Sequence, residues 1–225
     1  MATHLDLEEQ EQLDQLKHFW ATWGTLITTM VTIAMVVLAG WNGYKFWQAR
    51  QAAQAGGLYD VMEASANAQD LERLNQAFAD MKQKFGGSAQ AFQAGLLTAK
   101  VNQEAGKLDV SKEALTWLVG TTASGEQAIA RLRLASVLVE QGTLEDALQI
   151  VSVEVPVEFT AVVADRKGDI LALMGKSAEA VAQYKIALNA FEPGVEYGRL
   201  VQVKLDALGV PADSAALDSA KGLVK

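Results

Sequence analysis

The stretch GKSAEAVAQYKIALNA, residues Gly175–Ala190, decides the fold class. Its glycine is followed five positions later by Ala180 and nine positions later by Tyr184. The same arrangement occurs 33 residues earlier: Gly142, Ala147 and Val151. In a helical hairpin, a glycine can end the first helix, and a small residue lets the second helix pack closely against it. Repetition at this interval predicts a stack of similar helix pairs.

An earlier unit shows the same order with one irregularity. Ala99 precedes Gly106 by seven positions, which is also the separation in the two later units. Ala114 then lies three positions too far along to match the alanines of those units, which predicts a three-residue insertion between Lys107 and Ser111. The order is similar to that of tetratricopeptide repeats. The tryptophan and tyrosine typical of the first helix of that motif are missing, so the repeats are degenerate.

The rest of this region also reads as helix. It has no strand-like alternation of useful length, and its three prolines stand near segment ends. A helix continuing from about residue 46 to 68 is expected to bend at Gly56-Gly57 and to pack against a second helix over 70–85. A last amphipathic helix over 195–208 is expected to cap the stack. The sequence suggests four N-terminal caps: Ser88, Ser124, Thr143 and Ser177.

An uncharged run of 26 residues, Phe19 to Tyr44, precedes the repeats. About 20 apolar residues in a helix suffice to cross the hydrocarbon core of a bilayer. Aromatic residues gather at both ends of the run, as is typical of the two headgroup layers: Phe19, Trp20, Trp23, Trp41, Tyr44, Phe46 and Trp47. A buried core helix would rarely be this long without a charge, and a cleaved signal peptide would have a shorter apolar region and a basic start. The sequence therefore predicts a transmembrane helix.

One face of this helix carries small or hydroxyl-bearing residues at spacings of three and four. They are Thr22, Thr25, Thr29, Thr32, Val36, Ala39 and Gly43. Such a face permits close contact with a partner helix in lipid. The alternative is that the threonine hydroxyls bond to carbonyls of their own helix, in which case the pattern has no partner. Both interpretations remain open at this point.

Composition excludes several kinds of chemistry. The chain has no cysteine, and its two histidines, His4 and His18, precede the uncharged run. Thiol nucleophiles, disulfides, thiolate metal sites and imidazole-based catalysis are therefore absent from the large domain. The net charge is −8 and no basic patch occurs, so nucleic acid is a poor candidate partner. We expect no enzyme activity, no bound metal and no cofactor.

Two sets of residues remain as candidate sites. Asp165 and Asp169 lie one helical turn apart in a dense charged cluster and could serve as an acid/base pair or cation site. The favoured interpretation is a solvated helix face whose charges neutralise one another. Trp117 is expected in the core. Transferring the repeat spacing gives groove-facing partner contacts: Lys100, Gln103, Ser136, Val139, Asp169 and Ala172.

The order of these features resembles the YfgM-like family, ancillary subunits of the bacterial Sec translocon. The resemblance rests on an acidic head, one span flanked by aromatic residues, degenerate repeats and three short motifs. The motifs are LRLA at 132–135, VADRKGD at 163–169 and KLDAL at 204–208. The resemblance implies a single-pass protein of the bacterial inner membrane, with its N-terminus in the cytoplasm and its repeats in the periplasm. The implied partners are the SecYEG channel, a membrane-anchored periplasmic chaperone of the prolyl-isomerase type, exported client chains and membrane lipid.

These expectations divide the chain into four parts. They are an acidic cytoplasmic head (1–18), a transmembrane helix with aromatic belts (19–47), a repeat domain (48–208) and a C-terminal tail or short helix (209–225). The positive-inside rule weakly favours the opposite orientation, with the repeats in the cytoplasm, because Lys45 and Arg50 follow the span whereas only Lys17 precedes it. Orientation is therefore implied by the resemblance. The main alternative is a membrane-anchored repeat scaffold of another envelope or cytoplasmic-face complex.

Overall fold

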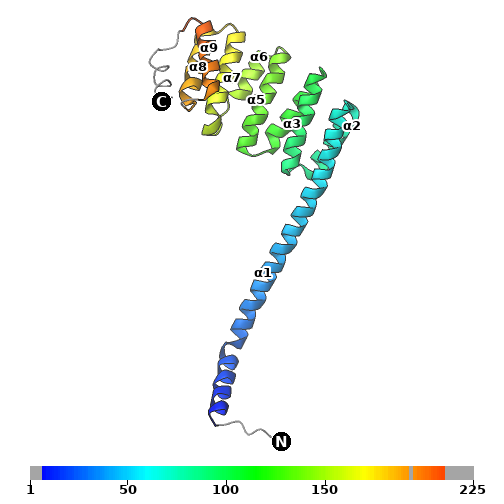
Figure 1. Ribbon diagram of the computed structural model, residues 1–225, viewed down its shortest axis with the longest axis vertical. Coiled ribbons are helices and arrows are strands. Elements are labelled where there is room, and N and C mark those ends of the chain that lie inside the picture. The colour runs from blue at the N-terminus through cyan, green and yellow to red at the C-terminus, as the bar shows by residue number, and fades with distance from the viewer. Residues whose placement is uncertain (1–6, 193–194, 211–225) are drawn as a thin grey trace, which may run out of the picture. The chain divides into compact units, whose positions relative to one another are not determined.

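The computed structural model describes residues 7–192 and 195–210, and every regular element in these ranges is a helix. The chain divides into two compact units, with the boundary between Gln54 and Ala55. The first helix, α1 (Leu7–Asn67), crosses this boundary (Figure 1). The predicted all-α class, with one long apolar helix before a repeat domain, is confirmed. The part of the predicted C-terminal tail from residue 211 onward lies outside the described residues.

In the first unit, α1 is long and apolar enough to cross a membrane, by length and composition. The uncharged run lies within it, and its large side chains are exposed except for that of Ile27, which is half-buried. The helix continues without interruption through Gly56 and Gly57, so the predicted bend does not break it. Two glycines cost a helix about 1 kcal/mol each, which long flanking helical segments can offset.

The second unit begins with the last turns of α1 and continues through helices that pack against their neighbours in chain order (Figure 1). They form pairs, α3 with α4, α5 with α6 and α7 with α8, and the end of α1 shares a buried core with α2. The bounds are α2 (Leu71–Phe85), α3 (Ala89–Glu104), α4 (Leu108–Thr121), α5 (Ser124–Glu140), α6 (Leu144–Val151), η1 (Val157–Phe159), α7 (Thr160–Leu173), α8 (Ser177–Ala190) and α9 (Glu196–Ala207).

The same turn ends the first helix of each pair. A residue with positive φ follows the helix, and the next backbone N–H bonds back to a carbonyl five residues earlier, as in Lys107 N to Asn102 O at 2.8 Å. The residues with positive φ are Gln69, Gly106, Gly142, Gly175 and Gly209. After each of the first four, the second helix starts two residues later. The helix ends predicted at the three middle glycines, near residue 68 and near residue 208 are confirmed, whereas the left-handed conformation of Gln69 was not predicted.

The register of the second helices corrects one prediction. Five residues after each of the first four positive-φ residues, the second helix buries a side chain completely: Leu74, Ser111, Ala147 and Ala180 are all 0% exposed. Ser111 therefore occupies the position that alanine fills in later pairs. The prediction of an insertion before Ala114 was wrong, because a serine small enough for this contact was not recognised as the equivalent residue.

The predicted caps are partly correct. Ser88 accepts a hydrogen bond from Ala91 N at 3.1 Å and is a true N-cap. Ser124 and Ser177 instead lie just inside their helices, and Thr143 precedes its helix but donates to the carbonyl of Leu138. Ser177 lies inside its helix because the helix begins two residues after the left-handed Gly175, and Thr143 is the single residue between Gly142 and its helix. Asp70, which caps Arg73 N at 3.0 Å, was missed.

Candidate functional site

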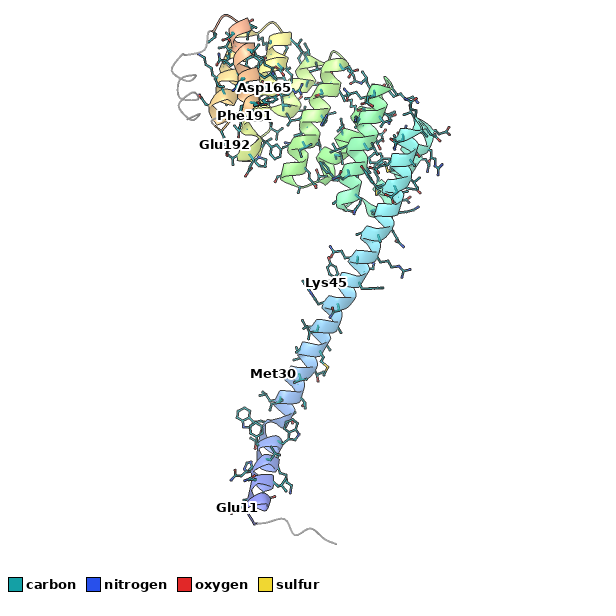
Figure 2. The ribbon with its side chains drawn as sticks, viewed as in Figure 1. Glu11, Met30, Lys45, Asp165, Phe191 and Glu192 are labelled. Carbon is teal, nitrogen blue, oxygen red and sulfur yellow. The ribbon has the colours of Figure 1, made fainter. Side chains whose placement is uncertain are left out.

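The most distinctive polar feature of the repeat unit is a buried carboxylate on α7. Asp165 is 2% exposed, and its two oxygens accept hydrogen bonds from two residues of α9. Lys204 Nζ lies 2.7 Å from Oδ1, and Tyr197 Oη lies 2.8 Å from Oδ2. The ring of Phe191 lies beside that of Tyr197, with centroids 5.3 Å apart. Figure 2 shows Asp165 and Phe191 at the same end of the helical repeats. The interpretation of Asp165 as part of a solvated face was therefore wrong.

Asp169 joins the same cluster one turn further along α7. Lys204 Nζ also lies 2.7 Å from Asp169 Oδ1, so one ammonium group bridges two carboxylates. Tyr184 Oη, from α8, donates to Asp169 at 2.8 Å, and Lys204 sits 5.5 Å from the centre of the Tyr184 ring. We call these five residues, Asp165, Asp169, Tyr184, Tyr197 and Lys204, the α7–α9 polar cluster. It joins three helices.

The cluster replaces an apolar contact found one repeat earlier. Tyr197 and Lys204 stand in α9 at the same distances before the terminal glycine as Val163 and Ile170 in α7. Those two side chains are buried in the main core together with α5. Both oxygens of Asp165 are occupied by partners within the chain, so neither is available to a substrate. The geometry therefore favours a structural role, fixing α9 against α7, over acid/base chemistry.

The environment shifts three pKa values in this cluster. Burial, and then the hydrogen bond to Asp169, raise the pKa of Tyr184. Burial and the hydrogen bond to Asp165 likewise raise the pKa of Tyr197. For Lys204, burial alone would lower the pKa, but the hydrogen bonds to the two carboxylates outweigh it and raise the pKa. All three shifts mean that the folded chain holds these protons more tightly than the unfolded chain does.

We expect the free energy of unfolding to fall as the pH rises above about 10, where these groups begin to lose protons in the unfolded chain. The contribution is fully present below the ordinary pKa values and is lost as the pH passes the raised ones. Urea titrations at several pH values between 8 and 11.5, in steps of about half a unit, measure the slope. Tyr184→Phe should make it shallower. Equal slopes for both proteins would contradict this assignment.

The predicted groove residues are placed on first helices, but most have partners within the chain. Lys100 is exposed and lies 3.9 Å from Glu104. Gln103 Nε2 donates to Glu140 at 2.7 Å, and the Ser136 hydroxyl donates to the carbonyl of Leu132. Val139 and Ala172 pack against the two cores, and Asp169 belongs to the polar cluster. That the six line a partner groove stays a prediction.

The predicted span face is exposed throughout. Three of its threonine hydroxyls donate to carbonyls of α1 itself: Thr22 to His18, Thr29 to Thr25 and Thr32 to Thr28, at 2.7–2.9 Å. This is the intrahelical alternative, and it leaves those hydroxyls satisfied in lipid without a partner helix. A partner for the small residues Ala39 and Gly43 stays a prediction.

Trp117 packs as expected. Its ring meets that of Phe78 edge to face, with centroids 5.6 Å apart, at the border of the main core.

The paired helices, their shared turn and the small residues between them define an α-helical repeat protein. The family model of the tetratricopeptide repeat-like domain matches residues 17–210. The ancillary SecYEG translocon subunit of Neisseria gonorrhoeae is 33% identical over 156 residues, which cover 68% of this chain and 74% of that protein. The chain therefore belongs to the tetratricopeptide repeat-like family, and its similarity to YfgM-like proteins is confirmed.

A solved structure shows the same fold at low identity. The crystal structure of MamA has a TM-score of 0.50 and 15% identity, covering 72% of this chain and 91% of that one. At this identity the likeness concerns the fold alone.

Proposed function

We propose that this chain is a non-enzymatic ancillary subunit of the Sec translocon that tethers a periplasmic chaperone, emerging exported chains, or both near the channel. The similarity to a protein named as an ancillary SecYEG translocon subunit carries this proposal. The fold supports it, since one apolar helix can anchor the chain and a stack of helix pairs offers extended surfaces to other polypeptides. The groups of the polar cluster hydrogen-bond to one another, which favours a structural role for its carboxylates over a catalytic one.

The proposed arrangement is that of a single-pass inner-membrane protein. The acidic head would lie in the cytoplasm, residues 19–47 would span the bilayer and residues 48–208 would lie in the periplasm. There the repeats would bind a membrane-anchored chaperone of the prolyl-isomerase type. A scaffold of another envelope complex would share this build, so the partner distinguishes the two functions.

Purification of the full chain through a C-terminal tag in a mild detergent, followed by mass spectrometry, should recover subunits of the SecYEG channel together with a prolyl-isomerase-type chaperone. A variant whose uncharged run is replaced by an unrelated transmembrane helix is the matched control. Since the span would contact helices of the channel, we expect this variant to stay in the membrane but to lose most of the channel subunits. Recovery of neither partner by the native chain would refute the proposal, and recovery of a different envelope complex would favour the scaffold.

Orientation has its own test. Alkaline phosphatase fused after Lys225 folds only in the periplasm, and a fluorescent protein that matures only in the cytoplasm, fused at the same point, gives the opposite readout. We expect an active phosphatase and a dark fluorescent protein. The reverse pattern would place the repeats in the cytoplasm, as the charges flanking the span weakly suggest.

A further inference from the structure

A hollow lies between α2 and α4, which are the second helices of adjacent pairs. It has a volume of about 510 Å³ and is open to solvent. None of its lining residues belongs to the α7–α9 polar cluster, so the two features are separate. The lining consists of Lys82 from α2 and of Asp109, Lys112, Glu113, Thr116 and Trp117 from α4.

The ring of Trp117 forms the apolar wall of this hollow. Phe78 packs against the ring edge to face, and a Cβ on Gly86 would lie 3.4 Å from its Cζ2 atom, so the ring is held in place from the side of α2. Trp117 is nevertheless only half-buried. Its indole N–H donates to no acceptor among residues 7–192 and 195–210. A partner segment would therefore find apolar surface and a hydrogen-bond donor on one fixed ring.

The polar groups of the hollow are unevenly satisfied. Lys82 pairs with Glu113 at 3.4 Å, and Asp109 accepts a hydrogen bond from Gln141 of α5 at 2.9 Å. Lys112 is half-buried but forms no ion pair with any residue in the described part of the chain. Both acids thus have partners, whereas one ammonium group and one indole N–H are free to bind an acceptor.

The charge around the hollow differs in sign from that of the whole chain. Residues 80–113 contain five lysines and four acids, a net charge of +1 in a chain whose net charge is −8. Each of the four acids has a side-chain partner, while two of the five lysines form no ion pair among the residues described: Lys107 and Lys112. A segment carrying Asp or Glu would complement this excess of unpaired positive charge.

We propose that the hollow between α2 and α4 binds a segment of another polypeptide in which an acidic side chain stands next to a large apolar one. The carboxylate would pair with Lys112, and the indole N–H of Trp117 would donate to a second acceptor of the segment. The apolar side chain would cover the exposed part of the ring. The hollow lies on second helices, whereas the predicted groove residues lie on first helices.

This inference deepens the proposed function by naming the chemistry of a segment that the repeats hold, and it rests on that function only for the identity of the polypeptide. Peptide binding and recovery of the channel are separate measurements, so either can fail while the other succeeds.

The test uses the full chain in dodecyl maltoside micelles, with 5-fluorotryptophan in place of tryptophan and fluorine NMR as the readout. The chain has five tryptophans, and only Trp117 lies in the repeat unit, so the other four are internal controls. Trp117→Phe identifies its resonance. The probe is the peptide acetyl-GDFEFG-amide, blocked at both ends so that its side chains carry all its charge. We expect a saturable shift of the Trp117 resonance alone, with a dissociation constant below about 1 mM.

Two charge variants should change this affinity in opposite directions. Lys112→Glu should weaken binding about tenfold, because it places a like charge beside the peptide carboxylate. Glu113→Gln should strengthen it about threefold, because it releases Lys82 for the peptide. Lys185→Glu is the matched control: this exposed lysine of α8 lies outside the hollow, so the dissociation constant should change less than about twofold.

Two further peptides separate charge from apolar contact on the native chain, and so hold whether or not a variant folds. Acetyl-GNFQFG-amide keeps the shape but has no charge, and acetyl-GDAEAG-amide keeps the charge but has no large apolar side chain. Both should bind at least about tenfold more weakly than the probe. Equal binding of the probe and the uncharged peptide would overturn the proposal. A Trp117 resonance that does not move, or equal affinity for the native chain and Lys112→Glu, would overturn it as well.

Discussion

Replacing Lys204 with methionine should destabilise the C-terminal end of the repeats by about 3–5 kcal/mol, the usual cost of removing one partner from a buried ion pair. The variant keeps most of the side-chain volume but leaves Asp165, 2% exposed, with Tyr197 as its remaining partner. Because repeats depend mainly on their neighbours, the loss should appear first as opening of α9. Hydrogen exchange at the amides of Val201 and Leu205 should speed up, and urea titration should give the loss in free energy.

Two comparisons make this result specific. Lys185 is an exposed lysine on α8 that forms no ion pair with any residue the structure describes, so Lys185→Met should change stability by no more than about 0.5 kcal/mol. Adding Asp165→Asn to Lys204→Met removes the carboxylate charge that has lost its partner. The double variant should regain part of the lost free energy of unfolding, which a double-mutant cycle quantifies. A loss below about 1 kcal/mol for Lys204→Met would show that the ion pair is not effectively buried.

Gly168→Ala should destabilise the same end by about 1–3 kcal/mol, the usual cost of overpacking a core. A Cβ at this position would lie closer than van der Waals contact to three atoms of the Tyr184 ring. The ring has little room to move, because Tyr184 is 3% exposed and its hydroxyl is bonded to Asp169. The clash outweighs the gain of about 0.5–1 kcal/mol that alanine brings to a helix interior.

Gly57→Ala is the matched control, since Gly57 is also inside a helix but has no atom within 4 Å of the added Cβ. It should stabilise the repeat unit by about 0.5–1 kcal/mol. Thermal and urea unfolding of both variants, compared with the native chain, measure the two opposite shifts. If Gly168→Ala also stabilised the protein, the close contact between α7 and α8 would be wrong.

The repeat architecture could be predicted because its signals are local. A glycine that ends a helix and a small residue five positions later lie within one turn region, so spacing alone reveals them. The same reasoning failed where another residue type filled the position. Gln69 adopts the left-handed conformation that glycine takes elsewhere, and Ser111 stands for alanine. The backbone follows the same turn at Gln69 and Ser111 as it does where glycine and alanine stand at the equivalent positions.

The polar cluster could not be predicted from local pattern. Asp165 meets Lys204 across 39 residues, and the acids and bases adjacent to Asp165 in sequence suggested neutralisation within α7. Only the register of successive repeats links these positions, because Lys204 stands in α9 where Ile170 stands in α7. Comparing equivalent positions for a change from apolar to charged residues would have indicated the contact.

The turn that joins the helices of each pair also fixes where this chain can change in length. From Gln69, Gly106, Gly142 and Gly175 the next helix always begins two residues later, at Leu71, Leu108, Leu144 and Ser177, although the turns themselves are 33 to 37 residues apart. All variation in the repeat interval is therefore confined to the stretch between one turn and the next. We therefore expect insertions, deletions and added reporter sequences to be tolerated better in that stretch than in the turns. The turn within a helix pair has the same length every time, whereas the number of residues from one such turn to the next varies.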